Sequence, residues 1–343
     1  MSAQALAAAA QKLLAGDKGL LAIDESNTTC NERFAELGIP QTEESRRAYR
    51  EMIITTPRLG ESISGIILYD ETIRQRTKVG MPFVAVLADA DIAVGIKVDT
   101  GANDLAGHPQ EKVTEGLDGL RGRLDEYRQM GARFAKWRAV ITLGEGIPTR
   151  GCIEANAQAL ARYAALCQEA GLVPVVEAEV LMAGDHNVEL SRATTEDVLR
   201  AVFKHLHSQR VLLEGVILKP NMILPGLNSG AQRSIDTVAD ETLSSLRRVV
   251  PAAVAGIAFL SGGQTPELAS ARLNAINSRA KEAGSHAPWP LTFSFARAIQ
   301  QPALAIWQGS DDKVIAAQQA LYRRAHLNRL ARRGEYTDAM ETA

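Results

Sequence analysis

Short apolar runs, many of them rich in β-branched residues, recur along nearly the whole chain and alternate with longer segments of helical periodicity. Apolar runs of this kind are typical of strands that are buried on both faces, as in parallel sheets. The chain contains eight of them, at residues 19–24, 63–69, 93–98, 133–138, 173–179, 213–219, 254–260 and 291–295. Eight strands that alternate with helices predict parallel pairing through right-handed crossovers and favour a closed barrel.

Helix signals fall between these runs. Thr194 is expected to cap one helix, and Pro266 after Thr265 is expected to open another, because proline suits the first helical position. A third helix starts near Glu154 and is expected to end at Gly171, since glycine accepts the left-handed conformation that follows many helices.

The main alternative to a barrel is an open, doubly wound sheet. That fold usually carries a glycine-rich GxGxxG turn after its first strand, and none follows Asp24. We therefore predict an α/β fold of the (β/α)8 TIM-barrel type, with extra helices before the first strand and after the eighth. No Gly/Ser/Pro-rich linker divides the chain, so residues 1–343 are expected to form a single domain.

The composition is typical of a globular protein, and its charge balance limits the classes of partner that we expect. Hydrophobic residues make up 46% of the 343 residues, and 38 basic against 40 acidic side chains give a net charge of −2. No global field therefore favours nucleic acid or an anionic membrane. The three cysteines, Cys30, Cys152 and Cys167, lack metal-type spacing. No apolar stretch approaches the length of a membrane span, and no export signal is evident. We expect reduced thiols and a cytoplasmic protein.

Several of the predicted strands carry charges near their carboxyl ends, where a barrel builds its active site. These charged residues are Asp24, Lys97, Lys136, Arg138, Glu177, Glu179 and Lys219. Period-two alternation places Lys136 with Arg138 on one face of a strand and Glu177 with Glu179 on one face of the next, so we expect facing pairs. Each charge alone could equally be a structural ion pair or the start of a loop, and that interpretation is favoured for Asp99.

The mouth of the barrel is expected to prefer an anion. Its predicted strand-end charges, together with Arg297, leave an excess of two positive charges. Ser261, Gly262 and Gly263 follow the seventh run, and Ser294 and Arg297 lie at the end of the eighth. Backbone N–H groups of a glycine turn and a guanidinium bind phosphate well, and loops after strands seven and eight commonly do so in this fold. A plain tight turn remains the alternative for the two glycines.

Lys219 is the candidate nucleophile. Crowding by Lys97 and Lys136 should lower the pKa of its amine and leave more of it neutral, as Schiff-base formation requires. Glu177 and Asp24 are then available for proton transfer. No metal site is predicted, because His205 and His207 point apart on a helix and the other histidines are scattered.

Eight motifs then resemble those of class I fructose-bisphosphate aldolases, in the family's order and over nearly the whole chain. They are Lys18-Gly-Leu-Leu-Ala-Ile-Asp-Glu-Ser26, Gly95-Ile-Lys-Val-Asp99, Gly116-Leu-Asp-Gly119, Phe134-Ala-Lys-Trp-Arg138, Val176-Glu-Ala-Glu179, Leu218-Lys-Pro-Asn221, Leu260-Ser-Gly-Gly-Gln264 and Ser294-Phe-Ala-Arg297. The resemblance implies reversible, metal-independent cleavage of fructose 1,6-bisphosphate in glycolysis or gluconeogenesis by a cytoplasmic homotetramer that needs no cofactor.

The resemblance also implies residue roles. Lys219 would form the Schiff base with the C2 carbonyl and Glu177 would be the main acid and base, assisted by Asp24, Lys136 and Glu179. The residues matching the open mouth, where the family holds hydroxyls and the C6 phosphate, are Lys97, Arg138, Ser26, Thr29 and Arg33. The residues matching the C1-phosphate site are Ser261, Gly262, Gly263 and Arg297, and Ser294 matches a substrate-binding position.

The sequence departs from the family pattern at small residues, Thr29, Ala178 and Ala296, and at its end. Many members continue into a tail whose terminal tyrosine protonates the enamine, whereas seven residues follow Tyr336 here. Either Tyr336 or another group protonates the enamine instead, or this protonation step is slower.

Three other functions stay open: cleavage of sedoheptulose 1,7-bisphosphate, a transaldolase-like transfer, and a non-catalytic barrel that acts as a binding scaffold.

Overall fold

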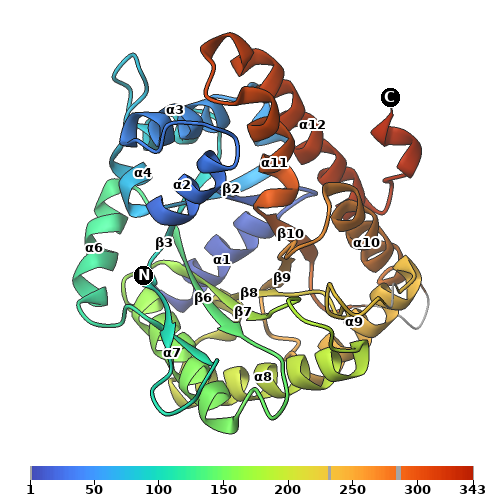
Figure 1. The fold of residues 1–343 in the computed structure, drawn as a ribbon. Coiled ribbons are helices and arrows are strands. Elements are labelled where there is room, and N and C mark those ends of the chain that lie inside the picture. Colours follow the sequence, from blue (N-terminus) through green and yellow to red (C-terminus); the bar gives the residue numbers. More distant parts are fainter. Residues whose placement is uncertain (1, 231–232, 283–286, 343) are drawn as a thin grey trace.

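The centre of the computed structural model, which describes residues 2–230, 233–282 and 287–342, is a closed parallel barrel (Figure 1). Its strands are β1 (Gly19–Ala22), β2 (Ile63–Leu68), β3 (Ala93–Lys97), β6 (Phe134–Ile141), β7 (Val173–Val180), β8 (Ile217–Pro220), β9 (Gly256–Phe259) and β10 (Leu291–Phe295). They follow the order β1-β10-β9-β8-β7-β6-β3-β2 around the barrel. Each of the eight predicted runs supplies one strand, and the predicted TIM barrel is confirmed.

Helices surround this barrel in Figure 1. They are α1 (Ala3–Leu14), α2 (Asn27–Ala35), α3 (Glu43–Ile54), α4 (Asp70–Arg74), α5 (Phe83–Asp89), α6 (Leu120–Met130), α7 (Arg150–Glu169), α8 (Val188–Ser208), α9 (Ile235–Val249), α10 (Pro266–Arg279), α11 (Arg297–Trp307) and α12 (Val314–Arg333). Short 3-10 helices add Leu59–Glu61, Leu213–Gly215, Asp311–Lys313 and Asp338–Glu341. Among these described segments, none combines the length and the apolar character of a membrane span.

The capping and proline signals in the sequence predicted some helix starts correctly and others wrongly. Pro266 opens α10 as predicted, and Thr265 caps this helix by accepting a hydrogen bond from the backbone N–H of Leu268. The prediction that Thr194 caps a helix was wrong, because Asn187 caps α8 and leaves Thr194 buried within it. The strand expected from residue 213 begins only at Ile217, because Leu213–Gly215 forms a 3-10 turn.

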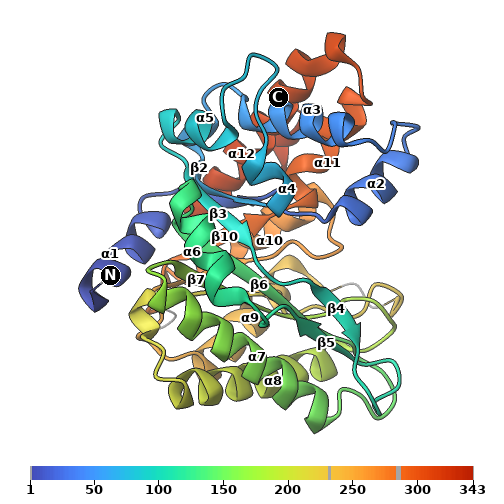
Figure 2. The same ribbon diagram turned by 90° about the vertical axis from the view of Figure 1, so that its left-hand side faces the viewer.

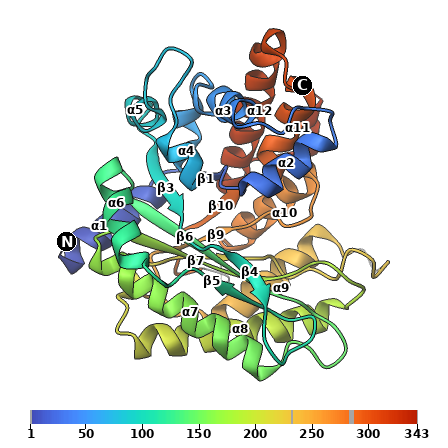
Figure 3. The same ribbon diagram turned by 60° about the vertical axis from the view of Figure 1, so that its left-hand side comes forward.

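A small hairpin outside the barrel was not predicted. Strands β4 (Gly101–Asp104) and β5 (Lys112–Glu115) pair antiparallel directly after β3. Figures 2 and 3 show the hairpin and α2 at one end of the barrel, with α1 at the opposite end. The hairpin strands are short, polar and mostly solvent-exposed or half-buried, so they lack the apolar run by which the barrel strands were recognised.

Two apolar cores hold the fold together. The larger lies between the strands and the helical ring, and it includes Trp137 and Leu218. The smaller fills the barrel interior with inward side chains such as Phe134 and Val175. Leu6, Ala10, Leu13 and Leu14 of α1 belong to this inner core as well. The extra N-terminal helix therefore closes the amino-terminal end of the barrel.

The same period-two alternation places the charged residues of the mouth on the strand faces that also carry the inner-core residues. On β6, Phe134 lies in the inner core and Lys136, two residues on, faces the same interior. On β7, Val175 is followed in the same way by Glu177, and on β8 Ile217 is followed by Lys219. An apolar layer thus supports a layer of charged side chains directly above it.

Glycines on β2 and β3 make room for the ring of Phe134. A Cβ at Gly95 would lie 2.3 Å from that ring, and one at Gly65 would lie 2.9 Å from it. Gly95 is also the register partner of Phe134 across the β3–β6 pair. Because a closely packed interior relaxes little, the ring cannot simply move aside.

Gly95→Ala is therefore expected to lower the free energy of unfolding by about 1–3 kcal/mol, as overpacking does, measured by urea denaturation. Phe134→Leu replaces the clashing ring with a smaller side chain. The double variant should therefore lose less free energy of unfolding than the two single variants lose together. Strictly additive losses would contradict this packing.

Candidate active site

A cavity of about 610 Å³ opens at the carboxyl ends of the strands. Fourteen of the fifteen residues predicted for the site line it: Ser26, Thr29, Arg33, Asp24, Lys97, Lys136, Arg138, Glu177, Glu179, Lys219, Ser261, Gly262, Ser294 and Arg297. The exception is Gly263, which is exposed and packs beside Leu227. The structure thus brings together residues from seven separate segments of the chain.

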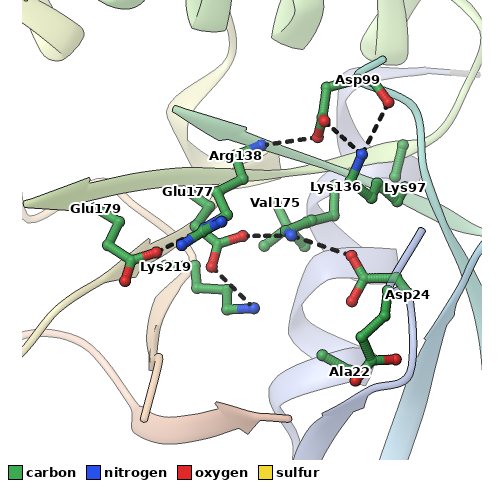
Figure 4. A network of polar contacts seen from close by, with 12 residues as sticks. Ala22, Asp24, Lys97, Asp99, Lys136, Arg138, Val175, Glu177, Glu179 and Lys219 are labelled. Atoms are coloured by element: carbon green, nitrogen blue, oxygen red, sulfur yellow. Dashed lines mark hydrogen bonds and ion pairs between the residues drawn. The ribbon is translucent and has the colours of Figure 1, made fainter. Parts of the chain in front are cut away.

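A buried chain of opposite charges occupies the floor of this cavity (Figure 4). The Lys136 ammonium lies 3.0 Å from Oδ2 of Asp24 and 2.7 Å from Oε2 of Glu177. The other carboxylate oxygen of Glu177 lies 3.2 Å from Nζ of Lys219. All four side chains are more than nine-tenths buried. Burial of unpaired charges would be costly, and each of these charges has an opposite neighbour.

The facing pairs expected between β6 and β7 form, with an offset along the strands. In the register, Arg138 lies opposite Glu177 and Lys136 lies opposite Val175. Each cation nevertheless reaches the carboxylate two residues further along β7: Lys136 contacts Glu177, and Nε of Arg138 lies 2.6 Å from Glu179. The pairing therefore aligns four charges on two adjacent strands.

These contacts determine which groups of the buried cluster are charged. Burial opposes ionisation of Asp24 and Glu177, but Lys136 and Lys219 outweigh it and lower the pKa of both carboxyl groups. Burial likewise opposes the charged form of Lys136, yet Asp24 and Glu177 raise its pKa. The carboxylates and Lys136 are thus all held in their charged forms.

Lys219 behaves differently from Lys136. Its pKa lies below the usual value, chiefly because of burial, and the positive charge of Lys136 lowers it further, while Glu177 acts in the opposite direction. The sequence analysis attributed this effect to crowding by two lysines, and that account is incomplete. Burial is the larger cause, and the ammonium of Lys97 is engaged elsewhere. The result is a buried amine in the cavity that is biased toward its neutral, nucleophilic form.

Lys97 and Asp99 form a separate ion pair at the edge of the cavity. The Lys97 ammonium lies 2.5 Å from Oδ1 of Asp99, and Oδ2 of Asp99 accepts a hydrogen bond from the backbone N–H of Arg138. This carboxylate therefore ties β6 to the segment after β3. The structure agrees with the structural interpretation favoured for Asp99.

The turn after β9 and the start of α11 form the opposite wall. Gly262 has a φ of +57° and its carbonyl accepts a hydrogen bond from Arg297 at 2.7 Å. The Ser294 hydroxyl is buried there without a hydrogen-bond partner. Among the basic side chains that line the cavity, only Arg297 has no carboxylate within 4.0 Å in the described residues. A guanidinium, a free hydroxyl and a glycine turn together suit an oxyanion such as phosphate.

Helix α2 supplies part of the mouth and several residues that the sequence analysis missed. The Ser26 hydroxyl caps the helix at the N–H of Thr29, and Arg33 lies 2.7 Å from Glu25. Glu32 and Glu36 also line the cavity. They lie three and seven residues after Thr29, so helical spacing from that residue was the signal that could have found them.

These carboxylates change the charge balance of the mouth. Counting every lining residue gives six basic and seven acidic groups, so the predicted excess of positive charge was wrong for the whole cavity. The prediction counted strand ends and omitted the helix and loops above them. Tyr69, at the end of β2, is another lining residue that was missed.

Tyr336 lies away from this cavity. Its hydroxyl donates a hydrogen bond to Glu341 at 2.8 Å, and 5% of the residue is exposed. Burial raises the pKa of this phenol, and Glu341 raises it further. In this arrangement Tyr336 does not line the candidate site. Within the described part of the chain, no group of three or more His, Cys, Asp or Glu side chains is arranged to hold a metal ion.

Comparison with known proteins gives consistent matches over the whole chain. The family model for class-I fructose-bisphosphate aldolase matches residues 5–343. A probable class 1 fructose-bisphosphate aldolase of Xanthomonas campestris is 54% identical over 98% of this chain and 99% of its own length. The chloroplastic fructose-bisphosphate aldolase 3 of Arabidopsis thaliana is 48% identical over 96% of this chain and 82% of its own. A solved Plasmodium falciparum fructose-bisphosphate aldolase superposes with a TM-score of 0.94 at 44% identity, covering 98% and 96% of the two chains.

The electrostatic coupling of Lys136 and Lys219 is testable through pH. Lys136→Met removes a positive charge that lowers the pKa of Lys219 and leaves Glu177 free to stabilise the Lys219 ammonium, so that pKa should rise. Reductive methylation of Lys219, followed by mass spectrometry across a pH series, should then reach half its maximal rate at higher pH than in the unmodified protein. Lys97→Met is the matched control, because Lys97 pairs with Asp99, and it should shift the profile less. An unchanged or acid-shifted profile in Lys136→Met would contradict the coupling.

Proposed function

The chain belongs to the class I fructose-bisphosphate aldolase family, and on that premise we propose that Lys219 is the residue that binds the substrate covalently. The reaction is the cleavage of fructose 1,6-bisphosphate in glycolysis. The observation that carries the proposal is the position of Lys219: a buried amine with a lowered pKa, 3.2 Å from a carboxylate, in the cavity that also holds Arg297. Every other proposed role follows from this one.

The first step forms an imine. The neutral amine of Lys219 adds to the C2 carbonyl of the open-chain ketose to give a carbinolamine. Glu177, a carboxylate at rest, is proposed to take the proton that the Lys219 ammonium loses when it becomes the neutral amine. It then passes this proton to the C2 hydroxyl, so that water leaves and a protonated C=N bond remains. Its two carboxylate oxygens, one toward Lys136 and one toward Lys219, suit a group that exchanges protons beside the nitrogen.

The second step breaks the C3–C4 bond. A carboxylate of the cluster takes the proton of the C4 hydroxyl, and the electron pair of the C3–C4 bond moves into the protonated imine to give an enamine. Glyceraldehyde 3-phosphate leaves as the aldehyde product. Asp24, Lys136 and Glu179 assist these transfers and orient the intermediates, since all three line the same cavity. The iminium acts as the electron sink, so the proposed reaction needs no metal ion.

The last step releases the second product. C3 of the enamine takes a proton, and water then adds to the imine carbon and displaces Lys219 as a free amine, which gives dihydroxyacetone phosphate. We propose that its phosphate lies against Arg297, Ser261, Gly262 and Ser294, where the cavity offers a guanidinium without a carboxylate partner. Gly263 shapes this turn from outside the cavity. At the other end, Lys97, Arg138, Ser26, Thr29 and Arg33 are proposed to contact substrate hydroxyls and the C6 end.

Assembly and location are proposed from family membership. We propose one domain over residues 1–343, a homotetramer and a cytoplasmic location. Light scattering should give about four times the chain mass of 36.9 kDa. A stable monomer at micromolar concentration would contradict the assembly.

Lys219→Arg tests the nucleophile. Arginine keeps a long side chain with hydrogen-bond donors beside Glu177, but its guanidinium stays protonated and cannot form an imine. Cleavage should be lost, while circular dichroism and binding of inorganic phosphate remain close to those of the unmodified enzyme. Near-normal turnover in Lys219→Arg would overturn the proposal.

Arg297→Ala tests the phosphate site. Fructose 1,6-bisphosphate and fructose 1-phosphate share the C1 phosphate, so kcat/KM should fall for both by about ten- to a hundredfold, as expected for a charge-assisted contact of ~1.5–3 kcal/mol. Arg297→Lys keeps a point charge without the planar fork of the guanidinium. Its kcat/KM should lie between that of Arg297→Ala and that of the unmodified enzyme. A loss confined to the bisphosphate would reverse the assignment of the two ends.

A further inference from the structure

One face of α2 is turned toward the cavity. Thr29, Glu32, Arg33 and Glu36 all line it, and they are spaced as neighbours on a single face of a helix. Figures 2 and 3 show α2 at the same end of the barrel as the β4–β5 hairpin. Thr100, Gly101 and Ala102 at the start of that hairpin line the cavity too. The mouth is therefore bounded by a helix that presents two carboxylates.

The positive charges at this end are already paired. Arg33 lies 2.7 Å from Glu25, and Lys97 lies 2.5 Å from Asp99. Arg138 lies 2.6 Å from Glu179. Glu25 is shared, because the Arg50 guanidinium lies 2.9 Å from its other carboxylate oxygen, so this group keeps one positive charge. The Lys97 and Arg138 pairs add little net positive charge to the mouth.

Glu32 and Glu36 are not balanced in the same way. Both are exposed, and no salt bridge or side-chain hydrogen bond involves either of them in the described residues. A carboxylate with no cationic neighbour keeps its full field toward an approaching anion, apart from screening by solvent and salt. The α2 end of the cavity is thus locally negative.

The part of the cavity formed by the start of α11 has the reverse character. It adjoins α2, because Arg33 hydrogen-bonds to Gln300 and Gln301 of α11. Within the described residues, the Arg297 guanidinium hydrogen-bonds only to the carbonyl oxygen of Gly262, and it remains available to an anionic ligand. With the substrate held covalently at Lys219 and one phosphate at Arg297, the proposed function places the other end against Ser26, Thr29 and Arg33 at the α2 mouth. A phosphate carried on that distal end would meet Glu32 and Glu36.

We propose that Glu32 and Glu36 are specificity-determining residues that oppose a phosphate on the distal end of the substrate. This inference rests on the proposed function, because it takes Lys219 and Arg297 as the fixed points of the bound ketose. The enzyme cleaves the bisphosphate, but the two carboxylates reduce the advantage of the bisphosphate over fructose 1-phosphate. A ketose 1-phosphate with an uncharged distal end avoids this repulsion.

The test is a substrate-by-variant comparison. Fructose 1,6-bisphosphate and fructose 1-phosphate are assayed with the unmodified enzyme, Glu32→Gln, Glu36→Gln and the double variant at low ionic strength. Glutamine keeps the shape of glutamate and removes the charge. Each single variant should raise kcat/KM for the bisphosphate by about two- to fivefold, mainly through KM, and the double variant by more. The monophosphate values should stay within experimental error of the unmodified enzyme.

Glu214→Gln is the matched control for net charge. Glu214 is exposed and lies in the 3-10 turn before β8, at the opposite end of the barrel, so this change alters the overall charge by the same amount without touching the mouth. It should leave the ratio of the two kcat/KM values unchanged. Added salt should also narrow the difference between the double variant and the unmodified enzyme, because it screens exposed charges.

Three results would overturn the inference: an unchanged ratio in the double variant, an equal gain for both substrates, or an equal change in Glu214→Gln. Failure of the proposed function would look different. In that case the unmodified enzyme would cleave neither substrate, or Lys219→Arg would remain active, whatever the ratio.

Discussion

The pairing of Lys136 with two carboxylates is the interaction on which the site depends. Four charged side chains lie more than nine-tenths buried above an apolar barrel core, where isolated ions would be strongly destabilised. Lys136 lies between Asp24 and Glu177, which keeps both carboxylates ionised and the lysine protonated. With Glu177 shared in this way, burial prevails at Lys219 and lowers its pKa. One set of contacts thus stabilises the buried cluster and leaves one amine reactive.

The rest of the cavity is electrostatically asymmetric. The turn at Gly262 and the guanidinium of Arg297 form one part of its wall, and the helix face with Glu32 and Glu36 forms another. Lys97 and Arg138 each lie against one carboxylate, whereas Arg33 shares Glu25 with Arg50. Recognition of a two-ended substrate therefore depends on which charges are left without a partner, and the total number of basic residues is a poor guide.

Alternation and strand ends were enough to predict the barrel and the charged residues at its strand ends. Ser26, Thr29 and Arg33 followed only from the resemblance to the aldolase family. Lys136, Glu177 and Lys219 stand out because each interrupts an apolar run two residues after a core position. The 3-10 turn at Leu213–Gly215 and the cap at Asn187 were missed, since competing local signals at residues 213 and 194 looked equally good. Pairing could not be predicted either, because it depends on how the segments meet in space. That is why the charge balance of the mouth was misjudged.

The central claim is that Lys219, and no other lysine of the cavity, forms the imine. Borohydride reduction in the presence of dihydroxyacetone phosphate converts that imine into a stable secondary amine, which peptide mapping locates. The label should appear on the peptide that contains Lys219, and it should be absent from the unmodified enzyme treated with borohydride alone. A label on Lys97 or Lys136, or no label at all under conditions of full turnover, would contradict the claim.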